Sequence, residues 1–175
     1  MFFISIIILI ISYSIFKIFL DIHQIKYIRS SQITDEELES INLTQEYVKK
    51  SKAYNIEKLN MSVFNTLIKS TMIIIFLSFD GMSILMKITA LVNIFSFNIE
   101  IVNIILFIIF LTLIDLPISY YKTFVIEKAH GFNRQSKSLF FKDFILSLIL
   151  SLIIFSILFL SFDALFNSYG NDWWF

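Results

Sequence analysis

The chain has 175 residues, of which 57% are apolar and 16% charged, and its mean hydropathy is +0.79. Helices that are apolar on every side belong in lipid or inside a much larger protein, and a chain of this length cannot bury them itself. Without cysteine there is no disulfide, no thiolate nucleophile and no cysteine-based zinc site. We therefore expect an all-α polytopic membrane protein whose partner is the lipid bilayer, with no nucleic acid partner.

The first predicted transmembrane segment covers residues 2–20. Nineteen mostly apolar residues at about 1.5 Å each cross about 30 Å of hydrocarbon. A secretory signal peptide would carry a basic amino-terminal region and a cleavage site of small residues. The first charge here is Lys17, and the sequence continues as FKIFLD. We therefore interpret the segment as a retained anchor.

Residues 21–60 form a polar connection that the sequence predicts to be helical. Thr34 and Glu37 match a capping box at the start of a short helix. Thr44 is a second candidate cap, for a longer helix without Pro or Gly that starts in water and enters the membrane near Met61.

Three further apolar segments follow. The second predicted span, residues 61–79, is stopped by Asp80-Gly81. Residues 82–98 are too short for an uninterrupted crossing, and we expect an interfacial or folded-back helix there. The third span covers residues 100–121 and the fourth 144–162, which completes a single membrane domain of four spans over the whole chain.

The basic residues are sorted between the two sides of the predicted spans. The connections 21–60 and 122–143, with the adjoining ends of the spans, carry 13 of the 14 Lys and Arg residues, and Lys87 alone falls on the other side. Cytoplasmic loops carry the excess of Lys and Arg. We therefore expect both connections in the cytoplasm and both termini outside, in a bacterial-type inner or plasma membrane. Trp173-Trp174 would then sit in an interfacial aromatic belt.

The polar segment between the third and fourth spans, residues 123–143, is predicted to form a helix–turn–helix tip. Gly131 ends its first helix, and Lys128 and His130 oppose the helix dipole in the last turn. Ser136 or Ser138 supplies the cap of the second helix.

Asp115 and Pro117 are candidates for an intramembrane functional site. A carboxylate within a span is costly, and Pro117 removes a helix hydrogen bond. The alternative is that Asp115 lies near the cytoplasmic end, reaches water and satisfies amides that the proline frees. Both interpretations stay open on the sequence.

The residues predict no catalytic and no metal site in this chain. Glu127 and His130 form one Glu-x-x-His pair on a helical face, but a di-iron bundle needs two such pairs and further glutamates. His23 is the one other histidine, and zinc normally takes three or four convergent ligands. The chain contains no H-E-x-x-H, nucleophile elbow or phosphate-binding loop.

The tip resembles a known signature. FVIEKAHGFNRQS followed by FFKD is similar to the amino-terminal membrane region of the CAAX prenyl protease 1 family, and the connection ITDEELESINLTQEYVKKSKAYNIEKLNMSVFNTL agrees with it. The resemblance runs from about Ile22 to Trp174. His130 departs from it, because the family usually has a bulky apolar residue before the glycine. The matching residues are Phe124, Glu127, Gly131, Phe132, Asn133, Arg134 and Asp143.

The resemblance implies one part of a larger helical barrel of an integral-membrane zinc metallopeptidase. It implies that H-E-x-x-H, the third zinc ligand and the glutamate that activates water lie beyond a fifth span, so this chain holds no cofactor and no catalytic residue. It then acts as barrel wall, with a cytoplasmic tip that contacts a protease-domain chain carrying H-E-x-x-H. The expected origin is a truncated or split gene.

Two alternatives come from other classes of function. Asp115 and Pro117 motivate a stand-alone four-span protein, acting as a small carrier or as a regulatory or assembly partner. The chain is alternatively a gene remnant whose product does not fold stably, because half a barrel leaves helix faces without partners.

Overall fold

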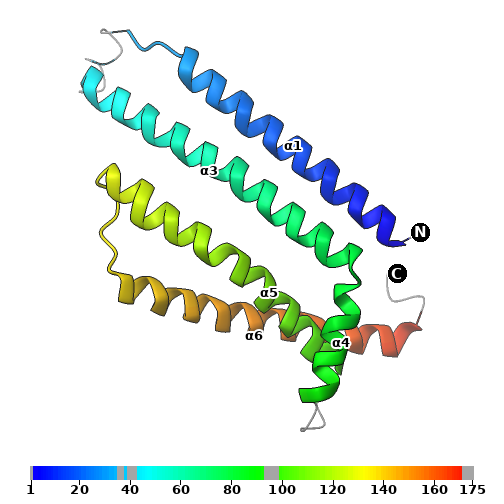
Figure 1. The fold of residues 1–175 in the computed structure, drawn as a ribbon. Coiled ribbons are helices and arrows are strands. Elements are labelled where there is room, and N and C mark those ends of the chain that lie inside the picture. Colours follow the sequence, from blue (N-terminus) through cyan, green and yellow to red (C-terminus); the bar gives the residue numbers. More distant parts are fainter. Residues whose placement is uncertain (1, 35–37, 39–42, 93–98, 171–175) are drawn as a thin grey trace. The chain divides into compact units, whose positions relative to one another are not determined.

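The computed structural model describes residues 2–34, 38, 43–92 and 99–170, and these residues contain helices and no strand (Figure 1). Four of these helices are long and apolar enough to cross a membrane. The prediction of an all-α protein with four spans is therefore confirmed. The helices are α1 (Phe2–Ser30), α3 (Gln45–Ser78), α4 (Gly81–Val92), α5 (Ile99–Tyr121), the π-helix η1 (Lys122–Glu127) and α6 (Lys137–Tyr169).

Three of the four long helices are longer than a bilayer requires. A span needs about 20 residues, whereas α1 has 29, α3 has 34 and α6 has 33. The connection 21–60 is therefore built largely from the end of α1 and the beginning of α3. Thr44 caps α3, since its Oγ1 accepts from the Tyr47 amide at 3.3 Å, as predicted. Glu37, the second residue of the predicted capping box, and the Trp173-Trp174 pair lie outside the described residues.

The turn after α3 uses Asp80, and not Gly81, for its left-handed residue. Asp80 has φ of 55°, and Gly81 begins α4. Asp tolerates this conformation because its short polar side chain bonds locally. The 12 residues of α4 are too few for a crossing, which agrees with the expected short helix.

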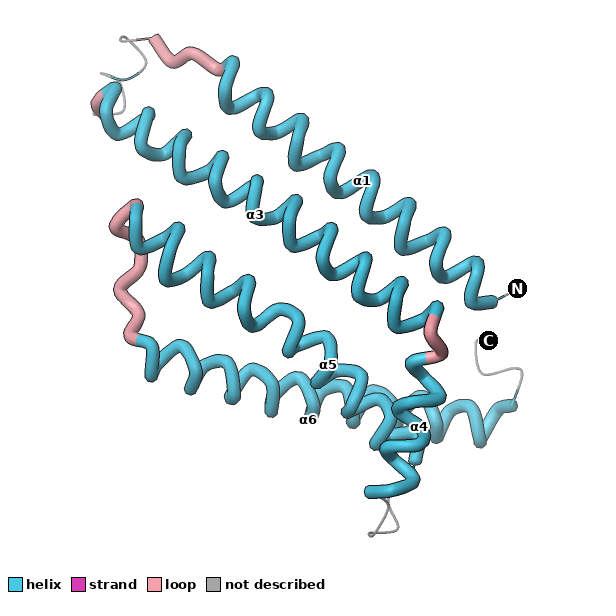
Figure 2. Tube along the Cα trace, in the orientation of Figure 1, coloured by secondary structure: helices cyan, strands magenta, loops and turns pink. Residues whose placement is uncertain are grey.

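The chain divides into two compact units. Unit 1 contains residues 1–79 and 114–134, and unit 2 contains residues 80–113 and 135–175. Within unit 1, α1 lies along α3 (Figure 2) and η1 packs against α3. Within unit 2, Thr89 of α4 donates a hydrogen bond to Asn103 of α5 at 2.6 Å. That the chain acts as one membrane domain stays a prediction.

The long helices turn most of their apolar side chains outward. Leu9 is 68% exposed and Leu146 is 62% exposed, although both lie in helices that are apolar on nearly every side. Such surfaces are stable only against lipid or other membrane helices. The buried apolar side chains of the described residues are Ile25, Leu38, Val48, Leu85, Ile118, Ile126 and Phe140.

Candidate functional site

The first helix of the tip ends in a turn that requires a residue with left-handed backbone angles. Gly131 has φ of +77°. The Phe132 amide donates to the Glu127 carbonyl at 2.8 Å, and the Gly131 amide donates to the Lys128 carbonyl at 3.1 Å. This 6→1 and 5→2 pair of bonds is a Schellman motif. The prediction that Gly131 ends the first helix of the tip is confirmed.

The second half of the tip begins α6. Ser136 is the cap, because its Oγ accepts from the Leu139 amide at 3.2 Å, which decides between the two serines. Asp143 accepts a hydrogen bond from Gln135 Nε2 at 2.7 Å. This side-chain bond ties the loop just before α6 to the second turn of the helix.

Aromatic contacts and one hydrogen bond between side chains hold the first half of the tip against α3. The Phe132 ring lies 4.7 Å from the Tyr54 ring, and the His130 ring meets Tyr54 edge-on at 5.4 Å. His130 Nε2 lies 3.0 Å from Glu57 Oε2, with the histidine side chain only 12% exposed. Sequence reasoning missed these partners, since nothing in their spacing relates positions 54 and 57 to the tip.

The described residues do not fit a zinc ion. They contain no group of three His, Cys, Asp or Glu residues that could hold a metal, and zinc takes three or four protein ligands. His130 Nε2 already faces Glu57, and His23 lies beside the Phe19 ring at 6.2 Å. Neither histidine is part of a ligand cluster.

The other signature residues lie around the same turn. The Phe124 ring packs on Tyr120 at 4.7 Å. The Asn133 amide donates to the Glu127 carbonyl at 3.2 Å, and Arg134 is exposed.

Asp115 has an ionic partner that the sequence did not reveal. Its Oδ2 lies 2.6 Å from Lys69 Nζ of α3, and the two side chains are 36% and 38% exposed. Two residues after Asp115, Pro117 removes one backbone donor, and the helix continues into the π-helix η1 at Lys122. The structure thus places Asp115 and Pro117 beside α3, where the carboxylate is already paired.

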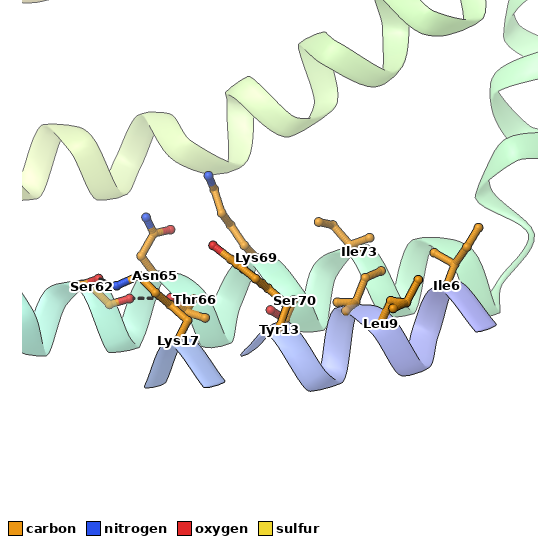
Figure 3. A pocket seen from close by; sticks show the side chains of 11 residues that line it. Ile6, Leu9, Tyr13, Lys17, Ser62, Asn65, Thr66, Lys69, Ser70 and Ile73 are labelled. Carbon is orange, nitrogen blue, oxygen red and sulfur yellow. Dashed lines mark hydrogen bonds between the residues drawn. The ribbon is translucent and has the colours of Figure 1, made fainter. Parts of the chain in front are cut away.

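One face of α3 carries polar residues at helical spacing, namely Lys58, Ser62, Asn65 and Lys69. A groove of about 540 Å³ opens along this face between α1 and α3 (Figure 3). Lys17 of α1 reaches across it to Ser62 Oγ at 3.3 Å and also pairs with Asp21 at 2.5 Å. The steps of 4, 3 and 4 residues were a readable signal for this face.

This geometry defines an integral membrane protein of long helices whose tip is fastened to the second span. Residues 24–175 match the family described as CAAX prenyl protease N-terminal, five membrane helices. The match covers most of the chain, which therefore belongs to this family, and the recognition from the tip signature is confirmed.

Two relatives show the same likeness. The chain is 39% identical to CAAX prenyl protease 1 of Saccharomyces cerevisiae over 61 residues, which are 35% of this chain and 14% of that protein. The crystal structure of S. mikatae Ste24p matches with a TM-score of 0.84 and 25% identity, over 98% of this chain and 41% of that chain. The chain thus spans less than half the length of these relatives, and the helical fold agrees with the expected part of a larger barrel.

Proposed function

We propose that residues 1–175 form the non-catalytic membrane wall of a zinc metalloendopeptidase similar to CAAX prenyl protease 1. A region that carries H-E-x-x-H completes the enzyme, from sequence outside these residues on the same or a second polypeptide. The zinc and the water-activating glutamate belong to that region.

The main observation in support of this proposal is that signature residues determine the conformation of the tip. Gly131 and Glu127 form the helix end, and Phe132 packs on Tyr54. A conformation fixed by so many local contacts is suited to present a rigid surface to another domain. The structural match covers 98% of this chain but 41% of Ste24p, which supports a membrane part and a separate catalytic part.

The proposed orientation has both basic connections in the cytoplasm and both termini outside. Contacts between the tip and α3 at Tyr54 and Glu57 support it, because they bring residues of both connections to the same end of unit 1. The tip then faces the cytoplasmic protease region.

Co-expression tests the proposal. The 175 residues are produced with a polypeptide that begins in an apolar span and contains H-E-x-x-H, taken from an adjacent reading frame or from a relative. We expect co-purification and zinc-dependent peptide cleavage. Changing the glutamate of H-E-x-x-H to Gln in the second polypeptide should abolish cleavage and leave co-purification unchanged.

Phe132→Ala should weaken co-purification, and Phe79→Ala is the matched control because its side chain is 77% exposed at the other end of α3. Zinc-dependent cleavage by the 175 residues alone would overturn the proposal. So would the absence of any association with the H-E-x-x-H polypeptide.

A further inference from the structure

Unit 1 has two grooves on one side of α3 that share Ser62 and Asn65. The first, of about 540 Å³, lies between α1 and α3 (Figure 3). The second, of about 230 Å³, lies between α3 and residues 118–122. The two grooves adjoin at these shared residues and are together called the basic groove here.

Lysines dominate the charge of the basic groove. Lys17 and Lys69 line its first part and Lys58 and Lys122 its second, and no carboxylate is among the described residues that line it. Asp21 and Asp115 lie outside the groove and pair with Lys17 and Lys69. Four lysines against two aspartates leave a net charge of +2.

The opposite end of the basic groove is apolar. Figure 3 shows Lys17, Ser62 and Asn65 toward one end, with Ile6, Leu9 and Ile73 toward the other. Since α1 and α3 are both long enough to cross a membrane, these ends lie at different depths. A cationic end and an apolar end along one groove match the chemistry of an anionic amphiphile.

We propose that the basic groove binds one anionic phospholipid, with its phosphate at the lysines and an acyl chain along Ile6, Leu9 and Ile73. The lysines of the groove keep N–H groups that can donate hydrogen bonds to a phosphate. Lys17 uses two of its three N–H groups on Asp21 and Ser62, and Lys69 uses one on Asp115. Basic pockets between transmembrane helices bind anionic headgroups in this way.

The competing interpretation is that the lysines only reach toward interfacial water, as long cationic side chains do at helix ends. That interpretation predicts no preference among headgroups. The proposal predicts selectivity for a negative headgroup and dependence on Lys58 and Lys122, whose charges neither aspartate balances.

The test uses the whole 175-residue chain in phosphatidylcholine nanodiscs with increasing fractions of phosphatidylglycerol. Bound lipid is counted by native mass spectrometry. Lys58→Gln with Lys122→Gln should weaken retention of phosphatidylglycerol about 30-fold, at about fivefold for each lysine. Lys26→Gln with Lys49→Gln is the matched control, because both are exposed on α1 and α3 outside the groove, and it should retain lipid as the unchanged chain does.

Circular dichroism checks that each variant folds. If the double variant Lys58→Gln with Lys122→Gln does not fold, each single variant is compared with the unchanged chain, and we expect a loss of retention of about fivefold. Equal retention of phosphatidylglycerol and phosphatidylcholine would overturn the proposal, as would an equal loss in the control pair. Displacement of the lipid by inorganic phosphate at equal concentration would show that the groove recognises a free anion and not a lipid.

Discussion

At the residue scale, Gly131 shows how one position fixes the tip. Beyond the adjoining residues, no heavy atom lies within 4 Å of the place where its Cβ would stand, yet its φ is +77°. A larger side chain at this position has room, but it strains the backbone because φ is positive. The requirement is conformational, which is why it was readable from the sequence.

Gly131→Val should lower the free energy of unfolding by about 1–2 kcal/mol, because a β-branched residue is unfavourable in the left-handed region. Unfolding in a titration with sodium dodecyl sulfate measures the loss. Gly131→Asn is the matched control and should lose less, since Asn also occurs at this cap position. Equal stability of all three proteins would contradict the role of the Schellman motif.

The ion pair between Lys69 and Asp115 allows a second test. A double-mutant cycle with Lys69→Gln and Asp115→Asn should give a coupling energy of about 0.5–1 kcal/mol, because both side chains are more than one third exposed. The measurement is again the free energy of unfolding in detergent. A coupling near zero would show that the pair does not fasten α5 to α3.

The hypothesis of a stand-alone carrier predicts a different role for Asp115. If the protein moved protons or ions, Asp115→Asn would abolish that flux in vesicles. We expect no flux from either protein, because the carboxylate is engaged by Lys69. A flux that disappears with the substitution would favour the carrier.

At the element scale, α4 is fastened to α5 by one buried hydroxyl. Thr89 is 0% exposed, and its Oγ1 lies 2.6 Å from Asn103 Oδ1 and 3.0 Å from the Leu85 carbonyl. A hydroxyl has one proton, so these two acceptors share it. The contact joins two largely apolar helices through a pair of polar side chains.

Thr89→Val should weaken this contact by about 1 kcal/mol, because the shape is kept while the half-buried Asn103 oxygen loses its donor. Faster amide hydrogen exchange in α4 would report the loss. Thr112→Val is the control, since Thr112 Oγ1 donates to the Ile108 carbonyl of its own helix at 2.7 Å. Similar exchange in the two variants would contradict a special role for Thr89.

At the scale of the whole molecule, we propose that the two basic connections share one side of the membrane. The sequence predicts this from the distribution of Lys and Arg. The structure supplies contacts between Phe132 and Tyr54 and between His130 and Glu57. The charge pattern and the packing are independent arguments for the same topology.

Cysteine labelling checks the topology directly, because the chain has no cysteine of its own. Lys49→Cys and Lys128→Cys should be protected from a membrane-impermeant maleimide in intact cells, and Phe79→Cys should react. Permeabilised cells, in which all three variants should react, provide the control. Labelling of Lys128→Cys in intact cells would reverse the proposed orientation.

The sequence by itself determined the long helices, the positions of Thr44 and Gly131, the choice of a serine cap for α6 and the family. These depend on hydrophobic runs and on caps that act over three or four residues, so the information is local. The π-helix η1, which contacts α3, was not predicted, because no local rule of capping or periodicity identifies a π-helix.

Only the tertiary structure decided which side chains meet across helices. Lys69 with Asp115, Glu57 with His130, and Thr89 with Asn103 are separated by 14 to 73 residues. No periodicity relates such positions, since pairing between helices depends on their crossing and rotation rather than on the spacing within either one. The polar face of α3 was readable from its spacing, but the groove beside it exists only because α1 lies along the same face.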